Sequence, residues 1–532
     1  MTSVVAPYNA TQLGSTPGIQ RDGTIFASQS YIDGQWVRFY NGMPKKIGGY
    51  SLLINNNKSV IRHLAAYPYQ NTVFIFVCDG TSVLITGVPS ALALPSIGQL
   101  DASSVVTPNA LGDASTFSST FFTAQSDLYP VPQFILSVTN NLSSVADQNL
   151  GLLYYCPINS DNTQMEIIYD AELASQILVS GGIVFISPFL VGFGKDGMIT
   201  WNNPEADDPI NSWSYQLDTT YLQNVAYVAN TNIIAAANTI GNNAPTGIFW
   251  SLNNLMRISF VPNSLTELPA YVPYVTVLSE SISIISAKSV VQIGQSFYWV
   301  GIDCFYIYNG SVTEIPNATN KLWFFETLDI TYSNKVVGVA VPAFSEIWWH
   351  FCDGKNGATE NNRAIIYNYS QGIWYDTVIA RSAGLSANVL RKPLMADSSA
   401  SNNLYGIWQH EVGFDKKIAN DLEAIPSSFV YNLTTLYSQQ GSQNRKLFSR
   451  RIEYDFKMTG NMTVSLKSCN YPAEYPSLAI PEGPYTFDSS TTHQDVTSMN
   501  RLMTAVFTSN CVGGNYQMGN TYLDWKYGSS SK

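Results

Sequence analysis

The chain has 532 residues, of which 45% are hydrophobic, 13% are aromatic and only 12% are charged. This aromatic content and low charge exclude a disordered chain, and they exclude a coiled coil, which needs Glu and Lys at heptad spacing. The 38 acidic and 27 basic residues leave a net charge of −11, which argues against a protein that grips nucleic acid through its phosphates. Tyr, Thr, Val and Ile among many Gly and Asn predict an all-β protein with tight turns.

Residues 1–50 are predicted to form an N-terminal arm built around a hairpin. A strand is expected at Trp36–Tyr40, followed by an Asn41-Gly42 turn, Pro44 and a Gly-Gly bend. The arm is locally basic, so it is either an ordinary capping hairpin or a docking arm for an acidic partner surface. The residues expected at such an interface are Trp36, Arg38, Pro44, Lys45, Lys46, Gly48 and Gly49.

Residues 51–426 are predicted to form a β-propeller. Short apolar runs recur beside Asx-Gly dipeptides, which are strong hairpin signals because both turn residues need positive φ. These dipeptides are Asp79-Gly80, Asp196-Gly197, Asn309-Gly310 and Asp353-Gly354. The units repeat about every 40–55 residues, which is typical of propeller blades. About six blades fit the available length, and five or seven remain open.

Other segments depart from this repeat. Residues 88–127 lack Lys and Arg and are predicted to be an inserted surface loop. Helical pieces are expected only near Asp170–Gln176 and Asn317–Thr327. From residue 427 to 532 the alternating strands predict a separate, sandwich-like C-terminal β-domain. Aromatic pairs recur on the propeller strands, and packing between blades is favoured over a carbohydrate-binding platform for them.

The acidic charge is concentrated in one part of the chain. Residues 63–256 contain one basic residue, Lys195, and 14 acidic residues. This distribution fits chance drift in a protein of low charge, and it fits equally a surface that must not hold a polyanion. The acidic residues singled out as candidates are Glu205, Asp207, Asp208 and Asp218.

Catalytic and cofactor motifs are missing from the sequence. The four histidines have no ligand at metal-site spacing, and no nucleotide-binding glycine loop or nucleophile elbow occurs. The six cysteines are widely spaced, which predicts buried free thiols. The N-terminus lacks the features of a secretory signal, and no apolar run approaches the length of a membrane span. We therefore expect a non-enzymatic protein without a cofactor or a membrane-spanning segment.

One stretch carries a specific family resemblance. The motif Asp33-Gly-Gln-Trp-Val-Arg-Phe39, followed by Asn41-Gly-Met-Pro-Lys-Lys-Ile-Gly-Gly49, resembles the N-terminal signature of the tail hub proteins of short-tailed bacteriophages. These are also called nozzle or packaged-DNA stabilisation proteins. Later stretches fit the same family in order: Phe297–Pro316, Ala343–Phe351, Ile365–Gly384 and the run that begins at Arg450.

The resemblance implies a structural virion protein of the tail, assembled in the host cytoplasm. Such proteins have a β-propeller body and form a homohexamer below the portal and its adaptor, with tail fibres or spikes attached nearby. The ring closes the channel over packaged DNA and conducts double-stranded DNA without specific binding during ejection. The acidic candidates would then line the channel, and the basic arm would meet a subunit or the adaptor.

Two alternatives stay open. The first is a glycan-binding or glycan-degrading β-propeller, which requires convergent carboxylates or aromatic side chains on one propeller face. The second is a secreted adhesin, which the missing secretory signal weakens.

Overall fold

The computed structural model describes residues 9–13, 16–28, 30–57, 59–79, 82–89, 104–106, 116–124, 127–139, 151–158, 165–170, 175–176, 178–213, 224–239, 244–263, 271–386, 390, 392–401, 403–433 and 445–530. This part of the chain is almost entirely β-structure, and α1 (Lys321–Thr327) is its one α-helix. Short 3-10 turns are η1 (Ile25–Ala27), η3 (Lys195–Gly197), η4 (Ala287–Ser289), η5 (Ile330–Lys335), η6 (Pro342–Phe344), η7 (Gly354–Asn356) and η8 (Pro472–Glu474). The predicted all-β class is confirmed.

The middle of the chain folds into consecutive antiparallel sheets, each built mainly from neighbouring strands. The first is β8 (Ile61–Tyr69), β9 (Thr72–Asp79), β10 (Val83–Pro89) and β11 (Ser104–Val106). The second is β12 (Thr116–Phe122), β13 (Gln133–Thr139), β14 (Gly151–Pro157) and β15 (Glu166–Ile167), with β18 (Leu178–Val179) also on β14. The third is β19 (Gly182–Ile186), β20 (Phe189–Phe193), β21 (Met198–Trp201) and β22 (Val225–Tyr227).

Four more sheets follow in the same manner. The fourth is β23 (Ile233–Thr239), β24 (Thr246–Ser251), β25 (Leu255–Pro262) and β26 (Tyr271–Ser279). The fifth is β27 (Val291–Ile293), β28 (Ser296–Val300), β29 (Phe305–Tyr308) and β30 (Val312–Glu314). The sixth is β31 (Val337–Val341), β32 (Glu346–Phe351), β33 (Arg363–Asn368) and β34 (Ile373–Val378). The seventh contains β35 (Arg381–Leu385), β36 (Leu394–Asp397) and β37 (Tyr405–His410).

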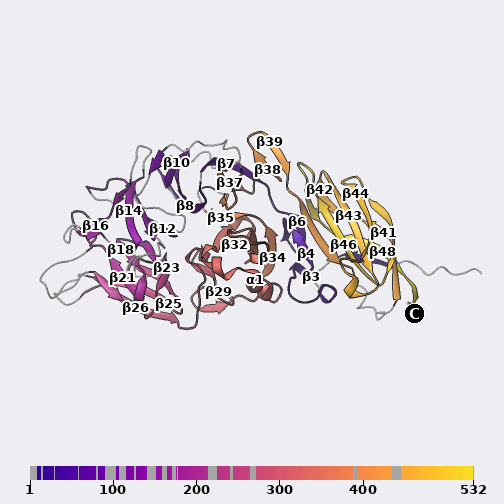
Figure 1. The fold of residues 1–532 in the computed structure, drawn as a ribbon, viewed down its shortest axis with the longest axis horizontal. Helices are drawn as coiled ribbons and strands as arrows, with labels where there is room; N and C mark the ends of the chain where they lie inside the picture. Colours follow the sequence, from indigo (N-terminus) through magenta and orange to yellow (C-terminus); the bar gives the residue numbers. More distant parts are fainter. Residues whose placement is uncertain are drawn as a thin grey trace, which may run out of the picture.

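Successive sheets contact one another mainly through their first strands, and the series closes on itself. Contacts run from β8 to β12, β19 and β23, where β23 contacts η4, and η4 contacts β28 and β31. β27 also contacts β31. From there they continue to β35 and return to β8. A closed series of antiparallel sheets with their first strands innermost is the arrangement of a β-propeller. Figure 1 shows this body with the β8, β23 and β32 sheets around one centre.

The last sheet is completed by a strand from near the N-terminus. β7 (Tyr50–Asn57) pairs antiparallel with β37, which supplies the fourth strand of the seventh sheet. β7 also pairs in parallel with β38 (Asp415–Ile418), which forms a hairpin with β39 (Asp421–Ala424). The described residues thus contain seven such sheets, of which five have four strands, the second has five and the seventh has six. The expected number of blades stays a prediction. β7 lies about 350 residues from its partner in β37, so local periodicity carries no sign of this pairing.

The C-terminal strands form three sheets, each of which includes a strand from the first 46 residues. The first has the order β1-β48-β41-β45, the second β4-β40-β46-β43-β44, and the third β42-β47-β6-β5. The N-terminal strands are β1 (Asn9–Leu13), β2 (Thr16–Ile19), β3 (Ser30–Tyr31), β4 (Asp33–Gln35), β5 (Val37–Tyr40) and β6 (Met43–Lys46). The C-terminal strands are β40 (Ser427–Asn432), β41 (Arg445–Glu453), β42 (Phe456–Thr459), β43 (Asn461–Cys469), β44 (Ile480–Asp488), β45 (His493–Asn500), β46 (Leu502–Ser509), β47 (Asn515–Met518) and β48 (Thr521–Ser530).

This arrangement places the N-terminal segment between the propeller and the C-terminal sheets. In Figure 1 the indigo strands β3, β4 and β6 lie between the β34 sheet and the yellow C-terminal strands. One continuous hydrophobic core joins Trp348 of the propeller, Val37 of the arm and Phe429 of the C-terminal sheets. The segment predicted as an arm is therefore an integral part of both neighbouring units.

Local expectations hold at most positions. The hairpin β5–β6 turns at Asn41-Gly42, where both residues have positive φ. The expectation of a helix near 170–176 is wrong, because Tyr169–Asp170 (β16) and Ser175–Gln176 (β17) pair as strands. Of the predicted insertion at 88–127, the Thr116–Phe122 segment forms β12, a strand of the second sheet, and much of the remainder lies outside the described residues.

Candidate functional site

The signature segment forms a joint between the propeller and the C-terminal sheets. We use "the joint" for residues 33–50 and the side chains they contact. Its centre is Arg38, whose side chain is 1% exposed. The guanidinium lies 2.9 Å from a carboxylate oxygen of Glu346 and 2.5 Å from one of Glu411, and it stacks over the Phe344 ring at 3.5 Å. Arg38 thus ties the arm to strand β32 and to the chain that follows β37.

The carboxylate of Glu346 is held by further donors. The Tyr375 hydroxyl donates to it at 2.5 Å and the Trp348 indole at 2.8 Å. Burial raises the pKa of Glu346, and the positive charge of Arg38 acts in the opposite direction. A buried carboxylate needs such a set of partners, because desolvation of an unpaired charge costs several kcal/mol. The joint is therefore an electrostatic network that depends on all of its members.

Trp36 fills the space beside this network. Its backbone has a φ of 55°, and its side chain is buried. The indole contacts the rings of Tyr50 and Trp348 edge-on, with centroids 5.7 and 6.1 Å away. Its backbone N–H donates to the Thr377 hydroxyl, and its carbonyl accepts from Ser427. Trp36 therefore contacts the propeller, β7 and the C-terminal sheets at once.

The two lysines of the signature, Lys45 and Lys46, also make contacts in the joint. Lys46 is buried, and its Nζ donates to the Gly514 carbonyl at 2.9 Å. Burial lowers its pKa, and Asp415 opposes that shift. Lys45 is half-buried, and its ammonium lies 4.9 Å from the centre of the Tyr40 ring. These charges make contacts within the chain, and their place at an interface with a partner stays a prediction.

Gly48 and Gly49 are explained by close backbone approach. A Cβ on Gly48 would collide with the Glu411 side chain, and one on Gly49 would collide with the backbone of Asp415. Pro44 is buried opposite Phe39 in the hairpin. All seven candidate interface residues therefore lie in the joint, and the structure gives each a role inside the chain.

A second ion-pair cluster lies at the edge of the joint. Arg21 pairs with Asp33 at 2.7 Å and with Asp376 of β34 at 2.8 Å. Arg363 shares the carboxylate of Asp376, at 2.7 Å. The Asp22 carboxylate accepts hydrogen bonds from the first backbone N–H groups of α1. The charges of this cluster also connect the arm to the propeller.

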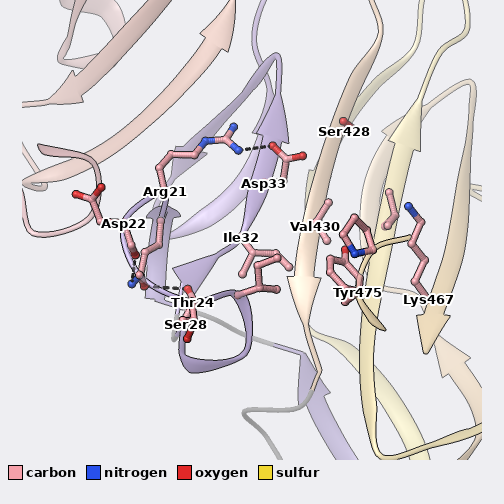
Figure 2. Close-up of a pocket in the computed structure, with 15 residues that line it drawn as sticks. Arg21, Asp22, Thr24, Ser28, Ile32, Asp33, Ser428, Val430, Lys467 and Tyr475 are labelled. Atoms are coloured by element: carbon pink, nitrogen blue, oxygen red, sulfur yellow. Dashed lines mark hydrogen bonds and ion pairs between the residues drawn. The ribbon is translucent and has the colours of Figure 1, made fainter. Parts of the chain in front are cut away.

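A pocket of about 500 Å³ opens between the arm and the C-terminal sheets. Figure 2 shows Arg21 and Asp33 on one wall, joined by an ion pair, and Val430, Lys467 and Tyr475 on the other. Neither histidine nor cysteine is among the described lining residues. The two carboxylates of the pocket, those of Asp22 and Asp33, are engaged by α1 and by Arg21.

The acidic candidates lie apart from the joint. Glu205 and Asp207 are exposed in the segment between β21 and β22. Asp208 accepts a hydrogen bond from the Tyr129 hydroxyl at 2.7 Å, so its carboxylate has an internal partner. Asp218 lies outside the described residues. The described part of the loop between β21 and β22 thus carries three of these acids, and the side chains of Glu205 and Asp207 in it are open to solvent.

The aromatic pairs and cysteines behave as packing residues. Trp299, Trp348 and Trp349 are all buried, which confirms packing over a carbohydrate platform for these pairs. All six cysteines are free thiols, and only Cys511 is partly exposed. Among the described residues no group of three or more His, Cys, Asp or Glu side chains could hold a metal ion. Within the same ranges, no helix has the length and apolar character needed to cross a membrane.

Sequence reasoning missed the partners of Arg38. Glu346 and Glu411 lie 308 and 373 residues away, and such separations leave no pattern in the sequence. One signal was present, because Glu346 begins a strand that is otherwise apolar and aromatic apart from His350. A carboxylate in a fully buried strand requires a cation, and Arg38 in the equally apolar strand β5 is a suitable one.

Comparison with known proteins adds little to this description. No family model matches the chain, and no curated protein matches it. Among solved structures the chain is similar to Sqt1 of Saccharomyces cerevisiae, with 9% sequence identity and a TM-score of 0.35. The match covers 68% of this chain and 98% of that one. A likeness at this TM-score carries no argument, so the β-propeller assignment rests on the sheet order and contacts described above.

Proposed function

We propose that this protein is a non-enzymatic structural component of a virion, the tail nozzle of a short-tailed bacteriophage. The observation that carries the proposal is the signature segment at 33–50, together with the later stretches that fit the same family in order. In this role the chain attaches below the portal and adaptor, retains packaged DNA and conducts it during ejection. Six subunits form the ring, and each contributes a propeller whose seven sheets are its blades.

The joint supports this proposal. Its residues are those of the signature, and their contacts connect three separate parts of one subunit. The signature can therefore be understood as the set of residues that fixes the C-terminal sheets against the propeller. A tail component that must withstand the pressure of packaged DNA benefits from such a rigid connection between its units.

The low basic content of residues 63–256 also supports a DNA conduit. A channel wall rich in Lys and Arg would bind the passing phosphates through counterion release, and an acidic wall avoids this. Glu205 and Asp207 are exposed, as this role requires. A structure of the assembled ring with both residues on its outer surface would contradict their assignment to the channel.

The decisive experiment is quantitative mass spectrometry of purified virus particles. We expect this chain at about half the copy number of the portal protein, as a six-subunit ring on a twelve-subunit portal requires. The major capsid protein serves as an internal reference for recovery. Absence of the chain from particles would overturn the proposal, and an assay of saccharide binding and release would then test the glycan alternative.

A further inference from the structure

A cavity of about 390 Å³ lies where the innermost strands of the propeller meet. Its lining comes from His63 of β8, Ser119 of β12, Ser137 of β13, Ala235 of β23 and Lys288 of η4. These residues come from three separate sheets and from η4. No carboxylate is among the described residues that line it.

Lys288 brings an uncompensated positive charge to this cavity. Its ammonium donates to the backbone carbonyl of Arg62, and it takes part in none of the ion pairs among the described residues. Its neighbour Arg62 pairs with Glu360 at 2.7 Å, and Lys335 pairs with the same carboxylate at 2.6 Å. Arg62 and Lys335 thus share the Glu360 carboxylate, and Lys288 has no carboxylate of its own among the ion pairs of the described residues. Burial, followed by the charge of Arg62, lowers the pKa of Lys288 to about 8.

Other polar groups line the same cavity. The Ser137 hydroxyl is buried and has no hydrogen-bond partner within the described residues. A bound acceptor would satisfy this orphaned hydroxyl. Ser119 contacts His63 at 2.7 Å from Oγ to Nε2. Burial, with a smaller effect of Lys288, lowers the pKa of His63 to about 3, so the ring is neutral and carries one N–H donor.

We propose that this cavity binds a small oxyanion, of the class of inorganic phosphate or sulfate, with Lys288 as its charged anchor. The ammonium has donors left after its bond to Arg62, and the Ser137 hydroxyl offers a further donor. The Ser119 hydroxyl is a donor as well when His63 carries its proton on Nε2 and donates it to the Ser119 oxygen. Tetrahedral oxyanions accept several hydrogen bonds at once, which suits donors arranged around a central space. With a lysine ammonium and no carboxylate among the described lining residues, the cavity favours an anion over a metal cation. The site does not depend on the proposed role in a virion.

Binding can be measured on the full-length protein with inorganic phosphate as the probe. Equilibrium dialysis against radiolabelled phosphate gives the affinity, and sodium chloride keeps the ionic strength constant. We expect Lys288→Met to weaken binding about tenfold or more, because a charge-assisted contact is lost. Lys417→Met removes an exposed lysine from the β38–β39 hairpin and serves as the matched control. Sulfate competition shows whether the site is selective among oxyanions.

A second variant keeps the test valid if Lys288→Met fails to fold. Ser137→Ala removes only the orphaned hydroxyl, so the protein should fold, and phosphate affinity should fall several-fold. The proposal is overturned if the unaltered protein binds no phosphate at millimolar concentration. It is equally overturned if Lys288→Met folds and binds phosphate as tightly as the Lys417→Met control.

Discussion

Arg38 is a buried cation shared by two carboxylates that come from distant parts of the chain. Glu346 is itself fully buried, so its charge has no access to solvent that could replace the guanidinium. Glu411 is also largely buried, at 12% exposure of its side chain. The removal of one member of such a group leaves uncompensated charge in a medium of low polarity. The contribution of Arg38 to stability therefore depends on its charge more than on its volume.

Replacement of Arg38 by methionine should lower the free energy of unfolding by about 3–5 kcal/mol. Methionine keeps much of the side-chain volume over Phe344, so the loss reflects charge. Chemical denaturation followed by tryptophan fluorescence measures the effect. A second substitution, Glu346→Gln, should restore part of the loss, because one of the uncompensated carboxylates disappears.

Arg451 provides the matched control for this substitution. It also pairs with a carboxylate, that of Asp495 at 2.9 Å, but the pair is on the surface. Exposed ion pairs contribute little because water solvates both charges. Arg451→Met should therefore leave the unfolding midpoint nearly unchanged. Equal effects of the two arginine substitutions would contradict the role given to the buried network.

The burial of His350 predicts that the free energy of unfolding depends on pH. It is fully buried, and neither ring nitrogen has a hydrogen-bond partner among the described residues. Burial, with a smaller effect of Arg381, lowers its pKa from 6.5 to about 3. Between these values the unfolded chain takes up a proton that the folded protein does not. Stability is therefore complete above about pH 6.5 and falls as the pH drops toward 3.

The substitution His350→Gln should reduce this slope by about 1.4 kcal/mol per pH unit, the value for one proton. Unfolding free energies measured by urea denaturation from pH 4 to pH 7 give the slope. His493 is exposed on β45 and offers the matched control in the His493→Gln variant. If the two variants keep the same slope as the unaltered protein, the buried histidine does not contribute in this way.

At the scale of elements, β7 holds a position that a local pattern cannot reveal. The hairpin β5–β6 was predictable, because Asn41-Gly42 supplies a turn signal between apolar strands. The pairing of β7 with β37 has no such signal, because its partner residues are separated by more than 300 positions. The same reason explains why Arg38 could be singled out but its carboxylate partners could not. A turn signal can be recognised from neighbouring residues, whereas the strand pairing that closes the ring joins residues far apart in the chain.

A proline in β7 should disrupt this closure. Ser51 lies between Gln409 of β37 and Lys417 of β38, so its N–H points toward a neighbouring strand whichever side it is on. Ser51→Pro removes that donor and should lower the free energy of unfolding by about 1–3 kcal/mol or more. Ser51→Ala, at the same position, keeps the N–H and should have little effect. Thermal unfolding compares them, and equal midpoints would contradict the role of β7.

At the scale of the whole molecule, the predicted division at residues 50 and 426 does not separate self-contained units. β1, β4 and β6 each belong to a sheet whose other strands lie mainly after residue 426. Leu13, Trp36 and Phe39 are buried in the same core as the C-terminal strands. The change in sequence character at residue 427 was visible, but strands supplied from the other end of the chain were not.

A fragment of residues 427–532 should consequently remain unfolded on its own. Without the N-terminal strands it loses one strand from each of two sheets, two strands from the third, and several buried side chains. The same fragment fused through a flexible linker to residues 9–47 should recover its fold. Near-ultraviolet circular dichroism distinguishes the two. A scrambled 9–47 segment is the control, and a folded 427–532 fragment alone would refute the prediction.

The pairing of β7 with β37 also determines when the propeller can close during protein synthesis. Asn57 and Tyr405, which face each other across this pair, are 348 residues apart. A ribosome that adds about 5–20 residues per second needs roughly 20–70 s to synthesise the intervening chain. During that time β7 has emerged from the ribosome and has no partner strand. The propeller cannot yet close between its first and seventh sheets. The ring of sheets can close only after the strands of the seventh sheet have been synthesised, which happens late in translation.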